Sequence, residues 1–132
     1  MEKTFCFFEF HDGMELIENY QPDFDLIFMD IKMERLNGLK TAEEIRKTDS
    51  TVGLFFLTSL SRYVWKGYEY GALNYLLKPI KYGRFKMKLD RFFSRYRVEE
   101  ELYISFSNDN GKKEISSLLE AQQQFVRCHG TG

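Results

Sequence analysis

The stretch Asp25-Leu-Ile-Phe-Met-Asp30 is the part of this chain that decides its predicted fold. It is a short apolar run that ends abruptly in a carboxylate, and two later stretches repeat the form: Gly53-Leu-Phe-Phe-Leu-Thr58 and Leu73-Asn-Tyr-Leu-Leu-Lys78-Pro79. Apolar runs of this length without alternation are typical of parallel strands that are covered on both faces. The sequence therefore predicts three buried strands, each closed by one polar side chain.

Helical patterns separate these runs along the chain. The spacing of apolar residues predicts helices over 14–20, 39–47, 62–70 and 82–97, and an aromatic-rich strand over 4–10. Strands that alternate with helices indicate a parallel α/β sheet with right-handed crossovers. In such sheets ligands bind beyond the carboxyl ends of the strands. We therefore expect Asp30, Thr58 and Lys78 to meet at one edge of the sheet.

An acid, a hydroxyl and an ammonium at one edge indicate phosphoryl chemistry on the acid. The carboxylate of Asp30 can attack a phosphoryl donor and form an acyl phosphate. The charge of the product is stabilised by a cation, usually Mg²⁺, and by groups such as Lys78 and Thr58. The structural alternative is that Asp30 caps a turn, Thr58 ends a strand and Lys78 is a solvated lysine. The ordered set, with one residue closing each run, favours the functional interpretation.

Composition predicts one soluble domain with a small appendage. The chain has 132 residues, of which 43% are hydrophobic and 17% aromatic, and its formal net charge is -1. No overall field therefore favours nucleic acid or acidic membranes, and no apolar run approaches the roughly 18 residues of a membrane-spanning helix. The two cysteines, Cys6 and Cys128, have no metal-ligand spacing and do not resemble a disulfide framework. A reducing cytoplasm is the expected location.

The segment from Asp23 to Arg97 resembles the receiver domain of a two-component response regulator. The matching motifs are Pro22-Asp-Phe-Asp-Leu-Ile-Phe-Met-Asp30-Ile-Lys-Met, Asn37-Gly38, Phe56-Leu-Thr58-Ser and Gly71-Ala-Leu-Asn-Tyr-Leu-Leu-Lys78-Pro79. The resemblance implies a flavodoxin-like α/β fold, a parallel sheet flanked by helices. Glu34 stands where the family commonly has proline.

The resemblance also implies a role for each matching residue. Asp30 would be the phosphoacceptor, Thr58 and Tyr75 the switch residues, and Lys78 the lysine that contacts phosphate. Mg²⁺ would bind Asp30 and the backbone carbonyl of Lys32. A sensor histidine kinase would be the partner, the Lys78-Pro79 peptide bond is often cis in the family, and the protein would not be an enzyme.

The opening strand and helix of the receiver family are missing, because residues 4–10 match the second strand of the family. The family's sheet order is 2-1-3-4-5, so the missing strand is the central neighbour of the strand that bears Asp30. Two arrangements could fill the vacant position in the sheet. In the first, the strand over 4–10 would move beside residues 25–29 and bring Glu9 and Asp12 to the metal. In the second, a second chain would fill the position, as a homodimer or strand-exchanged oligomer. A truncated coding sequence is a third interpretation.

After Glu101 the character of the chain changes. Residues 102–106 and 113–115 are predicted to pair as a hairpin around 107–111, followed by a helix over 116–124 and an extended segment over 125–128. Residues 102–106 and 125–129 resemble parts of a LytTR-type DNA-binding domain. The resulting domain division is a truncated receiver over 1–98 and a LytTR remnant over 99–132.

The charge of residues 99–132 counts against DNA binding. This range holds three basic residues (Lys112, Lys113, Arg127) and six acidic ones (Glu99, Glu100, Glu101, Asp109, Glu114, Glu120), whereas DNA binding depends on neutralising phosphates. No DNA-binding residue is therefore assigned. The predicted function is a response regulator that accepts a phosphoryl group on Asp30 and switches an output surface to control transcription. The alternative is a pseudo-receiver, an interaction module that works without phosphorylation.

Overall fold

The computed structural model describes residues 3–21, 24–30, 37–58, 74–95, 101–107, 112–121 and 125–127. The strands are β1 (Lys3–Glu9), β2 (Leu26–Asp30), β3 (Gly53–Thr58), β4 (Asn74–Leu77), β5 (Glu101–Phe106) and β6 (Phe125–Arg127). The helices are α1 (Gly13–Glu18), α2 (Gly38–Thr48), α4 (Tyr82–Arg95) and α5 (Lys112–Glu120). The strands and helices predicted before residue 98 are confirmed, except the helix over 62–70, which lies outside the described residues.

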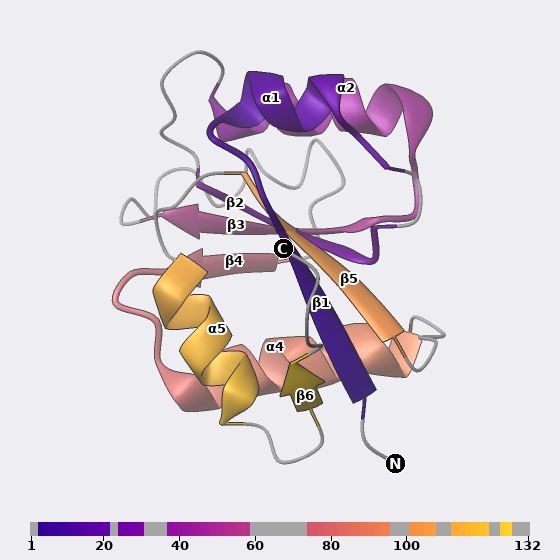
Figure 1. Ribbon diagram of the computed structural model, residues 1–132. Helices are drawn as coiled ribbons and strands as arrows, with labels where there is room; N and C mark the ends of the chain where they lie inside the picture. Colours follow the sequence, from indigo (N-terminus) through magenta and orange to yellow (C-terminus); the bar gives the residue numbers. More distant parts are fainter. Residues whose placement is uncertain are drawn as a thin grey trace.

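The strands form one parallel sheet in the order β4-β3-β2-β5-β1-β6 (Figure 1). β5 lies between β2 and β1: Phe106 is paired with Phe28 of β2 on one side and with Glu9 of β1 on the other. β5, from the C-terminal part of the same chain, therefore occupies the position beside β2 that the receiver family gives to its opening strand. The prediction that the strand over 4–10 moves beside β2 is wrong, and so is the prediction that a second chain fills the gap.

The predicted hairpin after residue 101 is also wrong. Residues 102–106 form a strand as expected, but residues 113–115 belong to helix α5. Both edges of β5 are already paired with β2 and β1, so no edge remains for a hairpin partner. Ile115 and Leu119 are fully buried at a spacing of four residues, which places them on one face of a helix. The strands of ranges 1–98 and 99–132 share one sheet, and the LytTR origin of the second range stays a prediction.

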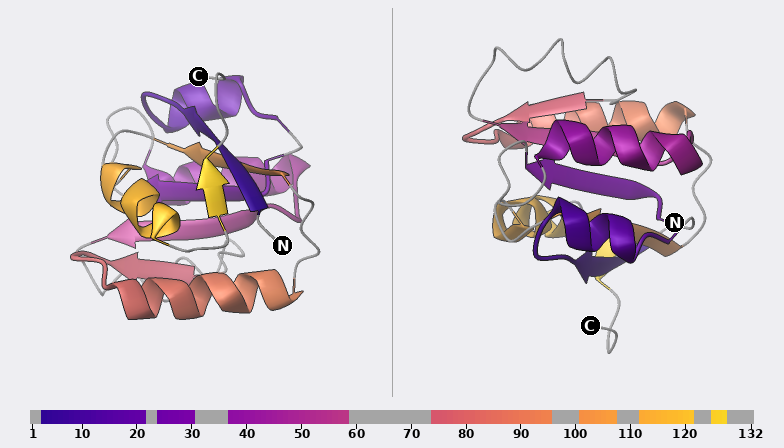
Figure 2. Two further views of the ribbon diagram at one scale, coloured as in Figure 1. Left: turned by 60° about the horizontal axis from the view of Figure 1, so that its bottom comes forward. Right: turned by 90° about the horizontal axis from the view of Figure 1, so that it is seen from above.

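Helices cover both faces of the sheet (Figure 2). On one face the apolar side chains of α4 and α5 pack against the strands, with Phe85, Leu89 and Phe92 on the buried side of α4. On the other face Leu16 of α1 and Ile45 of α2 pack against Ile27 and neighbouring strand residues. Burial on both faces is the physical reason why β2 and β3 are uninterrupted apolar runs.

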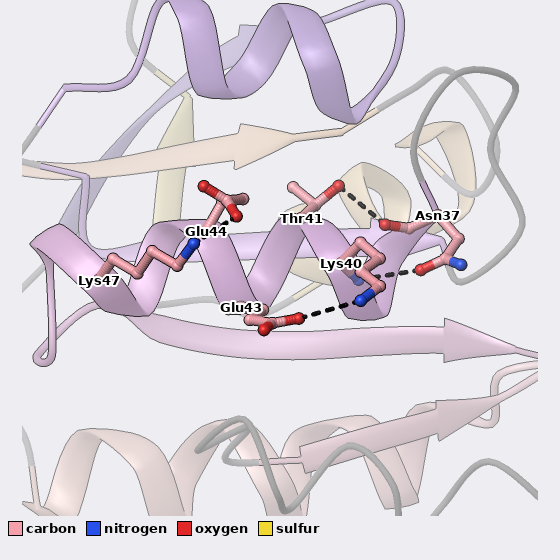
Figure 3. A network of polar contacts seen from close by, with 6 residues as sticks. All are labelled: Asn37, Lys40, Thr41, Glu43, Glu44 and Lys47. Carbon is pink, nitrogen blue, oxygen red and sulfur yellow. Dashed lines mark hydrogen bonds and ion pairs between the residues drawn. The ribbon is translucent and has the colours of Figure 1, made fainter.

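Helix α2 shows how local sequence sets the element boundaries (Figure 3). The side chain of Asn37 accepts a hydrogen bond from the backbone N–H of Lys40 at 2.9 Å, and its carbonyl accepts one from the Thr41 hydroxyl at 2.9 Å. Asn37 is thus an N-cap that satisfies free donors of the first turn. Ion pairs Lys40–Glu43 and Lys47–Glu44 lie on its solvated face. They are exposed, so each contributes little to stability.

Cys6 is disulfide-bonded in the structure. The expectation that the cysteines form no disulfide is therefore wrong for Cys6; the chain's other cysteine, Cys128, lies outside the described residues. The cysteines therefore no longer indicate a reducing compartment, and the cytoplasmic location stays a prediction. Within the described part of the chain, no helix combines the length and apolar character that crossing a membrane requires.

The central position of β5 makes Ile104 critical for stability. Ile104 is fully buried in the core that α4 and α5 share with the sheet. We expect Ile104→Ala to lower the free energy of unfolding by about 2–5 kcal/mol, because it leaves a cavity in that core. Urea unfolding measures the change. Met87→Ala, at a residue of α4 that is 52% exposed, is the control, with an expected change within about 0.5 kcal/mol. Equal effects of the two substitutions would contradict the placement of β5.

Asp49 makes stability depend on acid pH. Burial raises the pKa of its carboxyl, but hydrogen bonds from Tyr20, Thr51 and Val52 outweigh burial and hold the pKa below its ordinary value of 3.8. The stability from this carboxylate is therefore present above the ordinary value and is lost as pH falls through the lowered pKa of the folded state. Unfolding measured between about pH 5 and pH 2 should show a steeper loss in wild type than in Asp49→Asn. Tyr20→Phe should lie between them, and parallel curves for all three would refute the assignment.

Candidate functional site

Three strands deliver polar side chains to one edge of the sheet, as predicted. β2 ends at Asp30 and β3 at Thr58, and Asp30 is paired with Leu57, the residue just before Thr58. The backbone N–H of Lys78, directly after β4, donates to the carbonyl of Thr58 at 2.9 Å. Parallel pairing in this register brings the carboxyl ends of β2, β3 and β4 together (Figure 1).

Asp30 and Lys78 form an ion pair at this edge. Lys78 Nζ lies 3.2 Å from Asp30 Oδ2, and the side chains are 9% exposed for Asp30 and 30% exposed for Lys78. The pair is thus largely removed from water, which strengthens its electrostatic interaction. Lys78 is not the solvated lysine of the structural alternative. The Lys78–Pro79 peptide bond is cis, as the resemblance led us to expect.

The two predicted switch residues lie on the neighbouring strands, Thr58 on β3 and Tyr75 on β4. Thr58 is 5% exposed and Tyr75 is 4% exposed, so both are buried in the structure. The ring of Tyr75 packs at 5.7 Å from the ring of Phe56, the residue paired with it on β3. Their roles as switch residues stay predictions.

Ser107, which the sequence had placed in a hairpin turn, contacts Asp30 directly. Its hydroxyl accepts a hydrogen bond from the backbone N–H of Asp30 at 3.2 Å, and its own N–H donates to the carbonyl of Phe28 at 3.1 Å. Ser107 is fully buried. Sequence reasoning missed this residue because nothing in the local pattern shows that β5 lies beside β2.

Helix α5 reaches the same edge through Glu114. The carboxylate of Glu114 accepts a hydrogen bond from the backbone N–H of Ile80 at 3.0 Å, two residues after Lys78. Lys112, two residues earlier in the helix, forms an ion pair with Glu9 at the end of β1. The first turn of α5 therefore contacts both the segment that follows β4 and the end of β1.

The predicted metal ligands Glu9 and Asp12 are engaged elsewhere. β5 separates β1 from β2, so the strand move that would have brought them to Asp30 did not occur. Glu9 pairs with Lys112, and the Asp12 side chain accepts a hydrogen bond from the N–H of Glu15 at 3.0 Å as the N-cap of α1. The premise of that hypothesis is wrong, and Lys32 lies outside the described residues.

The described residues do not by themselves fit a Mg²⁺ site of the family's kind. Within the described ranges no group of three or more His, Cys, Asp or Glu side chains could hold a metal ion. Of the predicted ligands, Asp30 is the carboxylate that lies at the edge of β2, and Lys78 already contacts one of its oxygens.

Comparisons with known proteins agree with this architecture. The family model of the response regulator receiver domain matches residues 2–90. The probable C4-dicarboxylate response regulator DctR of Bacillus subtilis (strain 168) is 29% identical over 118 residues, which cover 88% of this chain and 49% of that protein. The sensory transduction protein LytT of Oceanobacillus iheyensis is 35% identical over 80 residues, which cover 59% of this chain and 32% of that protein. The chain thus spans half the length of these relatives or less.

Solved structures show the same fold at low identity. A two-component response regulator from Clostridium difficile has a TM-score of 0.61 and 16% identity, and the match covers 74% of this chain and 100% of that one. The response regulator TrrA from Thermotoga maritima, solved in complex with Mg²⁺ and beryllofluoride, has a TM-score of 0.56 and 21% identity, with 70% and 99% covered. With a family model that matches most of its length, the chain belongs to the response regulator receiver domain family.

Proposed function

We propose that this chain accepts a phosphoryl group on Asp30. The observation that carries the proposal is the ion pair between Asp30 and Lys78, with Lys78 Nζ at 3.2 Å from the carboxylate at the carboxyl end of β2. A carboxylate oxygen of Asp30 forms a bond to phosphorus while the bond from phosphorus to the donor's leaving group breaks. The leaving group departs with the electron pair of that bond.

Lys78 has a defined part in this reaction. Its ammonium is positioned to neutralise the negative charge of the incoming phosphoryl oxygens, and charge-assisted hydrogen bonds of this kind are stronger than neutral ones. The ammonium is paired with Asp30 before the reaction, so it needs to move only a short distance to contact the phosphoryl group. We infer that the donor is a sensor histidine kinase, since such kinases serve this family.

Thr58 and Tyr75 would carry the signal away from the site. The backbone carbonyl of Thr58 accepts a hydrogen bond from the backbone N–H of Lys78. Tyr75 lies on β4, three residues before Lys78. A phosphoryl group on Asp30 would recruit the Thr58 hydroxyl, and the Tyr75 ring would follow into the space that opens. These movements would change the output surface of the domain when Asp30 is phosphorylated.

We do not propose control of transcription for this chain alone. β5, which the resemblance related to a DNA-binding domain, is paired on both sides within the receiver sheet. Residues 99–132 carry three basic and six acidic residues. Neither the position nor the charge of this segment favours contact with DNA phosphates.

Phosphorylation can be tested with a small donor. Incubation with acetyl phosphate and Mg²⁺ should add one phosphoryl group, detected by intact mass and located on Asp30 by peptide mapping. Asp30→Asn should not be labelled. Lys78→Met should be labelled roughly tenfold more slowly or worse, because hydrogen bonds to charged groups contribute about 1.5–3 kcal/mol. Lys86→Met is the matched control, since Lys86 pairs with Asp90 on the exposed face of α4.

Two outcomes would count against this proposal. Absence of label in the wild-type chain, with and without a histidine kinase as donor, would favour a pseudo-receiver. Label on a residue other than Asp30 would reject the assigned phosphoacceptor. Repeating the reaction with EDTA in place of Mg²⁺ shows whether labelling depends on a metal, independently of the residues named here.

A further inference from the structure

The C-terminal segment of the chain reaches the Asp30 site at two separate points. Ser107 lies directly after β5 and contacts Asp30, which is 77 residues away in sequence. Glu114 lies in the first turn of α5 and contacts Ile80, which is 34 residues away. The first contact is made to β2, the strand that carries Asp30. The second is made to the segment after β4, which also carries Lys78.

Ser107 fixes the backbone of Asp30. After the paired residues of β2 and β5, the backbone N–H of Ser107 donates a hydrogen bond to the carbonyl of Phe28. The hydroxyl of Ser107 accepts a hydrogen bond from the backbone N–H of Asp30. It thereby adds one hydrogen bond to those between β2 and the β5 segment. Ser107 is fully buried, and Asp30 is buried as well. Without the hydroxyl, the N–H of Asp30 would lose its acceptor in a place where water is largely excluded.

Glu114 fixes the segment after Lys78. Its carboxylate is a charged acceptor for the N–H of Ile80, and Ile80 itself packs against the core beneath α4 and α5. The backbone of Lys78 is held on its other side by the carbonyl of Thr58. The direction in which the Lys78 side chain leaves the backbone is therefore set from β3 and from α5 together.

We propose that Ser107 and Glu114 are positioning residues of the phosphoacceptor site, which hold the backbones of Asp30 and Lys78 so that the acid and the ammonium stay in contact. As far as it concerns phosphorylation, the inference rests on the function proposed above. Its consequence is that the site is complete only when β5 and α5 are docked. The C-terminal segment thus supplies part of the site in addition to the strand between β2 and β1.

The test compares substitutions at these two residues with matched controls on the same segment. Ser107→Ala and Glu114→Ala remove the two acceptors, and Ser107→Thr and Glu114→Gln keep an oxygen that can accept the same hydrogen bonds. Ser117→Ala and Glu120→Ala are the controls, because both residues are exposed on α5. Thermal unfolding of each variant first establishes that it is folded at the assay temperature.

We expect the rate of labelling by acetyl phosphate to fall about two- to tenfold in Ser107→Ala and Glu114→Ala, the change that follows from losing one hydrogen bond. Ser107→Thr and Glu114→Gln should recover most of the wild-type rate, and the two controls should match it. Wild-type rates in folded Ser107→Ala and Glu114→Ala would overturn the proposal.

A second measurement does not require phosphorylation. NMR follows the change that Lys78→Met causes in the chemical shift of the Asp30 carboxyl carbon, first in the wild-type background and then in Glu114→Ala. We expect the change to fall to about half or less when Glu114 is absent, because the two side chains are then less often in contact. An undiminished change would overturn the positioning role of Glu114 even if the chain is never labelled. Failure of labelling alone would reject only the proposed function.

Discussion

The pairing of β5 with β2 and β1 is the interaction on which the rest of this structure depends. Without β5, the strands would form two separate groups, β4-β3-β2 and β1-β6, each with an unpaired edge in the middle of the molecule. Unpaired edges invite association with other chains. β5 supplies hydrogen bonds to both groups, from Thr4↔Glu101 to Glu9↔Phe106 on one side and from Leu26↔Ile104 to Phe28↔Phe106 on the other.

Aromatic packing reinforces the same junction. The ring of Phe106 stacks at 5.6 Å on the ring of Phe28 from β2 and makes an edge contact at 5.1 Å with the ring of Phe7 from β1. Phe28 in turn makes an edge contact with Phe55 of β3. A single residue of β5 thus connects the two groups of strands through rings in favourable geometries. The high aromatic content of the chain has its structural use in this core.

The functional site depends on the same junction. Asp30 belongs to the first group of strands and Lys78 directly follows it, but Ser107 and Glu114 from the C-terminal segment accept the backbone N–H groups of Asp30 and of Ile80, two residues after Lys78. At the opposite end of the β2–β5 pair, the Asp25 carboxylate accepts the N–H of Tyr103 at 2.9 Å and so fastens the start of β5. Docking of β5 and α5 therefore stabilises the fold, and it also brings Ser107 and Glu114 to the site.

The sequence by itself determined the elements whose signals are local. Asp30, Thr58 and Lys78 could be placed at one edge because each closes an apolar run, and parallel strands bring such ends together. Only the tertiary structure decided what lies beside β2. In β5, the apolar residues Leu102, Ile104 and Phe106 are buried in one core. Ser105 and Ser107 alternate with them, and this alternation is typical of a strand whose second face is exposed to solvent. Ser105 is nonetheless fully buried, and Ser107 contacts Asp30 across 77 residues of sequence. Pairing between strands so far apart depends on the complete core, so no local pattern could have revealed it.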